Sequence, residues 1–113
     1  MDETSPHTEL SLEGWDINHA VEVEWVPWGE GGAHAKVLGV ADGYVMALVE
    51  AGAGYRGTPH EHAHAEFFYL LDGSVTNQAT AMRAGDGYAA AAGSRHDEFH
   101  ADTPARYLSI FKL

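Results

Sequence analysis

The sequence predicts a single all-β domain, and its glycine turns and short apolar runs are the features that predict it. Thirteen glycines divide the 113 residues into short segments. Within these segments apolar residues alternate with polar ones or form brief aliphatic and aromatic runs, and no helical period persists. Many short strands separated by turns are typical of a β-sandwich or a β-barrel.

The chain is expected to divide into an acidic arm over residues 1–18 and one β-barrel domain over residues 19–113. Eight of the 17 acidic residues lie in the first 30 positions, which contain no lysine or arginine. Residues 20–26 then alternate apolar and acidic side chains, and this alternation predicts a half-buried strand. Residues 27–32 follow as a loop with a Gly-Gly turn.

The later strands are predicted from apolar runs that end at turn residues. Residues 34–40 and 44–51 are expected to form two strands joined by a hairpin turn at residues 41–43, Ala-Asp-Gly. The aromatic and aliphatic run 66–71 ends in the same kind of turn signal, Asp-Gly. Further strands are predicted over residues 76–83, 88–92 and 105–113, with another at Phe99.

The formal net charge of −11 bears on possible partners. Nucleic acids and anionic membranes are bound through basic patches, so neither is expected as a partner. Solubility is the simplest role for this charge. A bound divalent cation would still make its own pocket locally positive, so an anionic substrate remains compatible with the sequence.

The chain has no cysteine, which excludes disulfides and thiolate metal ligands. Any metal site must therefore use nitrogen and oxygen ligands. The absence of cysteine fits a reducing cytoplasm. No signal peptide is visible at the acidic N-terminus, and no apolar run approaches the roughly 20 residues of a membrane-spanning helix. We therefore expect a cytoplasmic protein.

The residues that point to chemistry lie in two blocks of the sequence. His60 and His62 stand one residue apart, Glu66 follows four positions later, and His96 belongs to the second block. Residues two apart on a strand share a face, so both histidines of the first block can aim at one metal ion. A straight strand would place Glu66 about 13 Å beyond His62, whereas metal ligands lie only about 2.0–2.2 Å from zinc. The chain must therefore bend between them if both bind the metal.

Glycines frame both blocks, and the framing resembles the two signature motifs of the cupin superfamily. The first block matches the pattern of glycine, five residues, His-x-His, three residues, Glu, six residues and glycine at every fixed place. The second block has Ala91 where the family usually has proline, and His100 where it often has asparagine. The framing glycines are Gly54 and Gly73 in the first block and Gly85 and Gly93 in the second.

The resemblance implies a single-domain cupin, which is a double-stranded β-helix or jelly-roll barrel, holding one divalent metal ion. Residues 25–28, 36–38 and 108–113 resemble small single-domain cupins related to the anti-sigma-factor cupin domain and to acetylacetone-type dioxygenases. Cupins commonly pair through their sheet edges, so a homodimer is expected, with the strand at residues 20–26 contributing.

The metal is expected to be iron(II), although manganese, nickel, cobalt or zinc also suits nitrogen and oxygen ligands. Glu66 is either a direct ligand or an acceptor that orients a histidine. The expected ligand set is His60, His62, Glu66 and His96.

Several other residues are candidates for the wall of the metal pocket. His64 is expected near the rim, and His100 either in the wall or beside a ligand. Arg56 either faces an anionic substrate group or lies in a surface loop. Large side chains that either line an apolar cavity or pack in the core are Met46, Phe68, Tyr88, Phe99 and Phe111.

Three kinds of function fit such a site. The first is a metal-dependent oxygenase acting on a small enolisable carbonyl or phenolic compound, and we favour this one. The second is a non-redox isomerase or lyase that uses the metal as a Lewis acid. The third is a sensor or ligand-binding module without turnover, because one fold hosts many functions.

Overall fold

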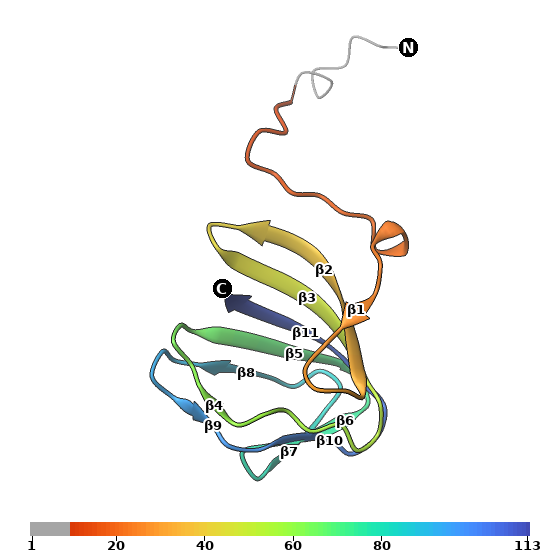
Figure 1. The fold of residues 1–113 in the computed structure, drawn as a ribbon, viewed down its shortest axis with the longest axis vertical. Helices are drawn as coiled ribbons and strands as arrows, with labels where there is room; N and C mark the ends of the chain where they lie inside the picture. Colours follow the sequence, from red (N-terminus) through yellow and green to blue (C-terminus); the bar gives the residue numbers. More distant parts are fainter. Residues whose placement is uncertain (1–9) are drawn as a thin grey trace.

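The computed structural model describes residues 10–113, which form two facing layers of β-strands (Figure 1). One layer is a six-stranded sheet in the order β1-β2-β3-β11-β5-β8. The other contains the three-stranded sheet β10-β6-β7 and the two-stranded sheet β4-β9. The all-β prediction is confirmed, although the sheets do not close into one continuous barrel. The strands are β1 (Val26–Pro27), β2 (Ala33–Ala41), β3 (Tyr44–Ala51), β4 (His60–Glu61), β5 (Glu66–Asp72), β6 (Ser74–Asn77), β7 (Thr80–Arg83), β8 (Gly87–Ala90), β9 (Arg95–His96), β10 (Phe99–Ala101) and β11 (Ala105–Lys112).

The predicted hairpin between β2 and β3 is present, with Asp42 and Gly43 as its two-residue turn. Both turn residues have positive φ, 54° and 80°, as a type I′ turn requires. The strands predicted at residues 66–71, 88–92 and 105–113 are β5, β8 and β11, with ends that differ by at most two residues.

The single strand predicted over residues 76–83 is wrong, because the chain reverses there to form the β6–β7 hairpin. Its turn residues, Gln78 and Ala79, have positive φ of 49° and 60°, which glycine usually supplies. Neighbouring residues hold the turn. The Gln78 side-chain oxygen accepts hydrogen bonds from the Asp97 and Glu98 amides, and the Glu98 carboxylate accepts one from the Ala79 amide.

The strand predicted over residues 20–26 is also wrong for most of its length. The chain forms a 3₁₀ turn, η2 (Ala20–Glu22), and pairs as a strand only at β1. Val21 is 88% exposed, because no second layer covers this segment and its alternating pattern has nothing to bury. The Ala20 carbonyl accepts a hydrogen bond from the Lys36 ammonium at 2.6 Å. A side chain thus takes the place that the backbone amide of a neighbouring strand would have.

Half of the predicted acidic arm, residues 1–9, lies outside the described residues, and the division at residue 18 stays a prediction. Residues 16 and 18 contact the edge of β2. The Asp16 carboxylate accepts a hydrogen bond from the Val40 amide at 2.9 Å, and the Asn18 side chain donates to the Leu38 carbonyl at 2.8 Å. In residues 10–113 no helix has the length and apolarity needed to cross a membrane.

The core lies between the two layers and comes from alternate residues of the long strands. β3 buries Val45, Ala47 and Val49, while the residues between them face away from the core. β5 and β11 follow the same alternation, as expected when one face of each strand packs in a core. Other buried members include Phe68, Leu70, Val75, Phe99 and Tyr107.

The framing glycines differ in how tightly they are enclosed, which yields a first prediction. A Cβ at Gly73 would lie 2.2 Å from the Pro104 carbonyl oxygen, whereas a Cβ at Gly85 would meet nothing within 4 Å. Both have positive φ. We expect Gly73→Ala to cost about 2–5 kcal/mol and Gly85→Ala about 1–2 kcal/mol in the free energy of unfolding. Urea unfolding of both variants measures this, and equal losses would contradict the close contact at Gly73.

Candidate metal centre

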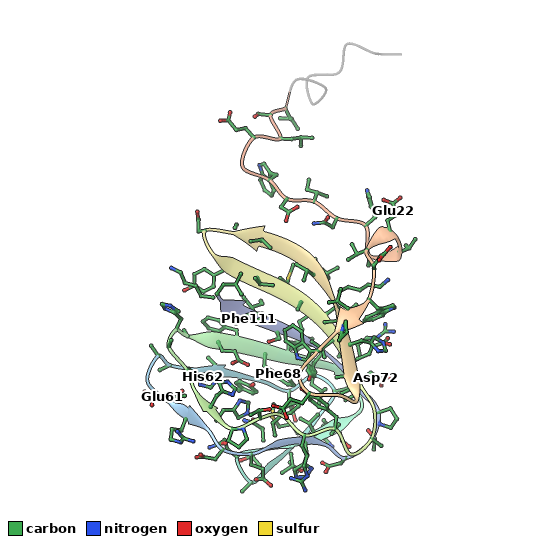
Figure 2. The ribbon with its side chains drawn as sticks, viewed as in Figure 1. Glu22, Glu61, His62, Phe68, Asp72 and Phe111 are labelled. Carbon is green, nitrogen blue, oxygen red and sulfur yellow. The ribbon has the colours of Figure 1, made fainter. Side chains whose placement is uncertain are left out.

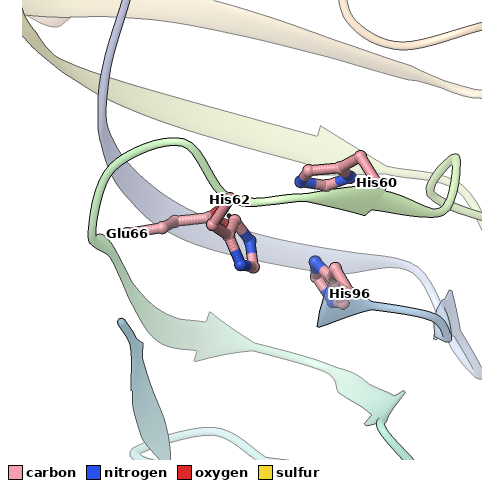
Figure 3. A group of neighbouring side chains, drawn as sticks. All are labelled: His60, His62, Glu66 and His96. Atoms are coloured by element: carbon pink, nitrogen blue, oxygen red, sulfur yellow. Dashed lines mark ion pairs between the residues drawn. The ribbon is translucent and has the colours of Figure 1, made fainter. Parts of the chain in front are cut away.

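The pairing of β4 with β9 brings the two sequence blocks together. His60 lies directly opposite His96 in this antiparallel pair, and His62 follows at the end of β4. Glu66 is the first residue of β5. The four side chains converge (Figure 3), and one ligand atom from each lies within 4.8 Å of the others.

The bend that the sequence requires between His62 and Glu66 is present. β4 ends at Glu61, and residues 63–65 form a bend before β5 begins. The bend returns the Glu66 carboxylate to the histidines instead of carrying it along a straight strand. His64 lies on this bend, is exposed, and lines the cavity described below.

Two of the histidines have one ring nitrogen anchored by the protein. His60 Nδ1 lies 2.8 Å from the Thr58 carbonyl oxygen, which can only accept, so Nδ1 donates. His62 Nδ1 lies 2.9 Å from the Ser94 hydroxyl, which donates its own proton to the Ala91 carbonyl and so accepts from His62. A neutral imidazole that donates through Nδ1 keeps its lone pair on Nε2. Both rings are therefore prepared to bind a metal.

His96 is anchored by Asn77, a residue that the sequence analysis missed. The Asn77 side-chain oxygen lies 2.5 Å from His96 Nε2. Burial lowers the pKa of His96 and so favours its neutral form. Asn77 ends β6, next to the glycine-free turn at residues 78–79. No sequence signal marked this residue, because the hairpin itself was not predicted.

The contact between His62 and Glu66 tests whether a metal fits. His62 Nε2 lies 2.9 Å from Glu66 Oε1, yet within residues 10–113 this buried nitrogen has no hydrogen-bond partner. Two lone-pair-bearing atoms at this distance repel each other unless a cation lies between them. Ligands at right angles around an ion, each about 2.1 Å away, are about 3 Å apart. The separation of these two donors therefore fits two ligands of one divalent ion, and His60 and His96 lie close enough to complete such a set.

Tyr88 holds the other oxygen of the Glu66 carboxylate. Its hydroxyl donates to Glu66 Oε2 at 3.1 Å. Burial, reinforced by the nearby Glu66 charge, raises the pKa of Tyr88 far above its ordinary value, so the phenol keeps its proton and remains a donor. Glu66 Oε1 is thereby directed toward the histidines, which favours direct binding of a metal by Glu66.

The cluster opens into a cavity of about 620 Å³ that is mostly apolar. Aromatic rings form much of its wall. Phe68 stacks on Tyr88 with ring centroids 4.7 Å apart, and it also contacts Tyr107 at 4.8 Å. Lys112 is the one lysine or arginine in the wall formed by the described residues. This shape suits a small, largely apolar molecule placed beside the metal ligands.

Three of the candidate wall residues lie elsewhere. Met46 faces outward on β3, between the buried Val45 and Ala47. His100 occupies the equivalent outward position on β10, where its ring nitrogens contact Glu98 and Asp102. Arg56 is exposed and pairs with His100 through an isolated backbone bridge. Strand parity is the reason for the first two corrections, because neighbours in a strand point to opposite faces.

The remaining candidates line the cavity, together with residues that were not singled out from the sequence. Phe68, Tyr88, Phe99 and Phe111 are in the wall. The β11 residues Tyr107 and Ser109 are also there. Their alternation in the predicted strand 105–113 is the signal that could have identified them. Tyr55 completes the phenols in the wall.

Comparison with protein families gives one match, to the model of the ChrR Cupin-like domain, over residues 16–111. This match covers most of the chain. The chain belongs to the ChrR cupin-like family. The family confirms the cupin resemblance inferred from the two motif blocks, including its likeness to the anti-sigma-factor cupin domain. Among curated protein sequences no significant match is found.

Solved structures with the same fold span several activities. An acetylacetone dioxygenase from Acinetobacter johnsonii aligns with a TM-score of 0.71 and 18% identity, over 78% of this chain and 67% of that one. A chain of the complex between Rhodobacter sphaeroides SigE and the anti-sigma ChrR aligns with a TM-score of 0.71 and 22% identity, over 80% and 50%. The polyketide cyclase RemF from Streptomyces resistomycificus aligns with a TM-score of 0.71 and 20% identity, over 84% and 77%. At these identities the likeness shows the fold alone.

The geometry of the cluster predicts how two neighbouring histidines differ. His62→Ala removes a buried nitrogen that faces Glu66. Losing a residue that only hydrogen-bonds to a metal ligand lowers metal affinity by about 10–100-fold. Losing a ligand itself should cost more, so we expect a fall of more than about 100-fold. His64→Ala is the matched control, and its affinity should stay within about twofold. Metal content after dialysis and a chelator-competition titration measure both. Full metal occupancy in His62→Ala would exclude this cluster as the metal site.

Asn77 provides a second, independent prediction. Asn77→Leu removes the oxygen that anchors His96, and we expect metal affinity to fall by about 10–100-fold. Thr76→Val is the control, because Thr76 faces the other side of β6 and donates to Asp102 at 2.8 Å. The same competition titration, with unfolding midpoints measured in parallel, separates loss of metal affinity from loss of stability. An unchanged affinity in Asn77→Leu would show that the contact does not position His96.

Proposed function

We propose that this ChrR-like cupin is a metal-dependent oxygenase that acts on a small enolisable carbonyl or phenolic compound. The observation that carries the proposal is the position of the ligand cluster, which opens into an aromatic, mostly apolar cavity of about 620 Å³. A neutral or weakly acidic organic molecule matches this lining better than a highly charged one. The likeness to an acetylacetone dioxygenase is compatible with the proposal but supports only the fold.

The proposed cofactor is one iron(II) ion, held by His60, His62, Glu66 and His96. Such an ion would supply Lewis acidity and the capacity to react with dioxygen. The ligand set also suits manganese, nickel, cobalt or zinc, so the choice of iron rests on the proposed reaction. A dioxygenase that cleaves its substrate and leaves both oxygen atoms of dioxygen in the products takes all four electrons from the substrate. Such a reaction would need no external reductant.

The wall residues would orient the substrate. Burial raises the pKa of Tyr107 well above its ordinary value, so its phenol stays protonated and can donate to a carbonyl or enolate oxygen. Ser109, two residues further along β11 and also in the wall, offers a second hydroxyl. Phe68 and Phe99 would contact the apolar part of the substrate. Tyr88 would keep Glu66 directed at the metal.

A different class of function also has a specific observation in its favour. The matching family is described by the ChrR Cupin-like domain, and one structural neighbour belongs to a complex with a sigma factor. A sensor or ligand-binding module on the same site would bind a small molecule without consuming it.

A non-redox isomerase or lyase is the third candidate, since the ligand cluster alone does not require redox chemistry. A homodimeric state and a cytoplasmic location are further parts of the proposal.

The three functions predict different dependence on metal and oxygen. With iron(II) and a panel of β-diketones and phenols, we expect substrate loss accompanied by stoichiometric oxygen uptake. The zinc-loaded protein should be at least about 100-fold slower, because zinc has no redox chemistry. Oxygen-electrode traces and product analysis measure this, with His62→Ala as the inactive control. Equal turnover under argon would favour an isomerase or lyase, and saturable binding without turnover would favour a sensor.

A further inference from the structure

The outer side of the six-stranded sheet carries an apolar surface that the fold leaves uncovered. β3, β11 and β5 are adjacent, and their residues pair in register across the sheet. One row contains Met46, Ile110 and Phe67, and the next contains Leu48, Leu108 and Tyr69. We call these six residues the outer patch.

The outer patch is unusual for a sheet that has its core on the other side. Antiparallel sheets with one solvated face normally alternate apolar residues inside with polar residues outside. Here Met46, Phe67 and Tyr69 are 37–47% exposed, and they extend as a continuous surface through the partly buried Leu108 and Ile110. Contiguous exposed apolar surfaces of this kind mark sites of association.

Residues 10–17, which precede η2 and are called the arm below, carry apolar side chains that the fold also leaves uncovered. Leu10, Leu12, Trp15 and Ile17 are 64–72% exposed, so these large apolar side chains contact little of their own domain. Figure 1 shows the arm running away from the edge of β2, and Figure 2 shows its side chains standing clear of the sheets. The chain thus has an uncovered apolar surface and an uncovered apolar segment that does not reach it.

Charge also favours contact between the arm and the outer patch. Within residues 10–17 the charged side chains are Glu13 and Asp16, and none is basic. Asp16 already bonds to the Val40 amide, so Glu13 is the charge free to meet a partner. Lys36, Arg106 and Lys112 share the outward strand parity of the outer patch. They are three of the six basic residues in the chain. Glu50 neutralises Arg106 through an ion pair, and the Ala20 carbonyl holds the Lys36 ammonium. This leaves Lys112, whose ammonium lies over the Tyr44 ring, to meet Glu13 from the arm of another molecule.

The edge of β2 is less suited to association. Asp16 and Asn18 already bond to the backbone of Val40 and Leu38, and Lys36 holds the following turn. These contacts occupy an edge that would otherwise pair with a strand from another chain. The segment at residues 20–26, expected from the sequence to contribute to a dimer, is therefore not where we locate the interface.

We propose that two copies of this chain associate through their outer patches, with the arm (residues 10–17) of each lying on the outer patch of its partner. A two-fold interface requires the same surface on both subunits, and each copy supplies both an uncovered surface and a segment that can cover it. The proposal rests on the homodimer proposed above and is independent of the oxygenase reaction.

The test compares oligomeric mass for the full chain and two double variants. Sedimentation velocity and light scattering should give a dimer for the wild type at micromolar concentration. Phe67→Glu with Tyr69→Glu places charges on the exposed part of the outer patch, and should raise the dimer dissociation constant at least about 100-fold, or about 2.7 kcal/mol. Leu12→Ala with Trp15→Ala trims the arm without touching the folded sheets, and should raise it at least about tenfold.

Val21→Glu is the matched control, because it adds a charge at an exposed apolar residue outside both the outer patch and the arm. It should leave the dissociation constant unchanged. Unfolding midpoints and metal content close to wild type in all variants would show that the fold and the metal cluster are intact. A monomeric wild type would overturn the homodimer, and would leave the patch to a different protein. If Phe67→Glu with Tyr69→Glu left the dissociation constant unchanged, the outer patch would not be the interface. If only Leu12→Ala with Trp15→Ala left it unchanged, the arm would not contact the partner.

Discussion

The two-residue pairing of β4 with β9 is the constraint on which the candidate site depends. It joins segments that are far apart in sequence and places His60 opposite His96. Backbone hydrogen bonds continue the pairing beyond β4, from the His62 amide to the Ser94 carbonyl at 2.8 Å and from the Gly93 amide to the His62 carbonyl at 2.7 Å. The same turn supplies the Ser94 hydroxyl that anchors the His62 ring. Backbone pairing and ligand orientation are therefore parts of one arrangement.

Around this pair, protein oxygen atoms orient the rings of the three candidate metal-binding histidines. Each histidine has one ring nitrogen in contact with a protein oxygen, from Thr58, Ser94 or Asn77. Ala91 replaces the usual proline of the motif, but the Ser94 amide and hydroxyl both donate to its carbonyl and close the turn. Rigidity that proline normally supplies through its ring is supplied here by hydrogen bonds.

The same ligand cluster is compatible with oxidation, Lewis-acid chemistry and ligand sensing. The fold is shared by an acetylacetone dioxygenase, an anti-sigma protein and a polyketide cyclase, so it does not choose among them. What distinguishes this chain is the surroundings of the cluster. The cavity is aromatic, and burial raises the pKa of the Tyr88 and Tyr107 phenols, which keeps them protonated. Within the described wall its one lysine or arginine is Lys112. These properties support the proposal of a small, weakly polar substrate with hydrogen-bond donors beside it.

The sequence by itself determined the all-β class, the cupin motifs and the four residues that converge, because glycine spacing and strand parity are local properties of the chain. It also required the bend between His62 and Glu66. Only the tertiary structure decided the rest. The Asn77 side chain contacts His96 because Gln78 and Glu98 hold the glycine-free turn that follows it. Residues 20–25 do not form the predicted strand, because no second layer of the fold covers them. Met46 and His100 lie outside the pocket in which they were expected, because their positions in β3 and β10 direct their side chains outward. Such outcomes depend on which segments meet in space, and no local pattern records that.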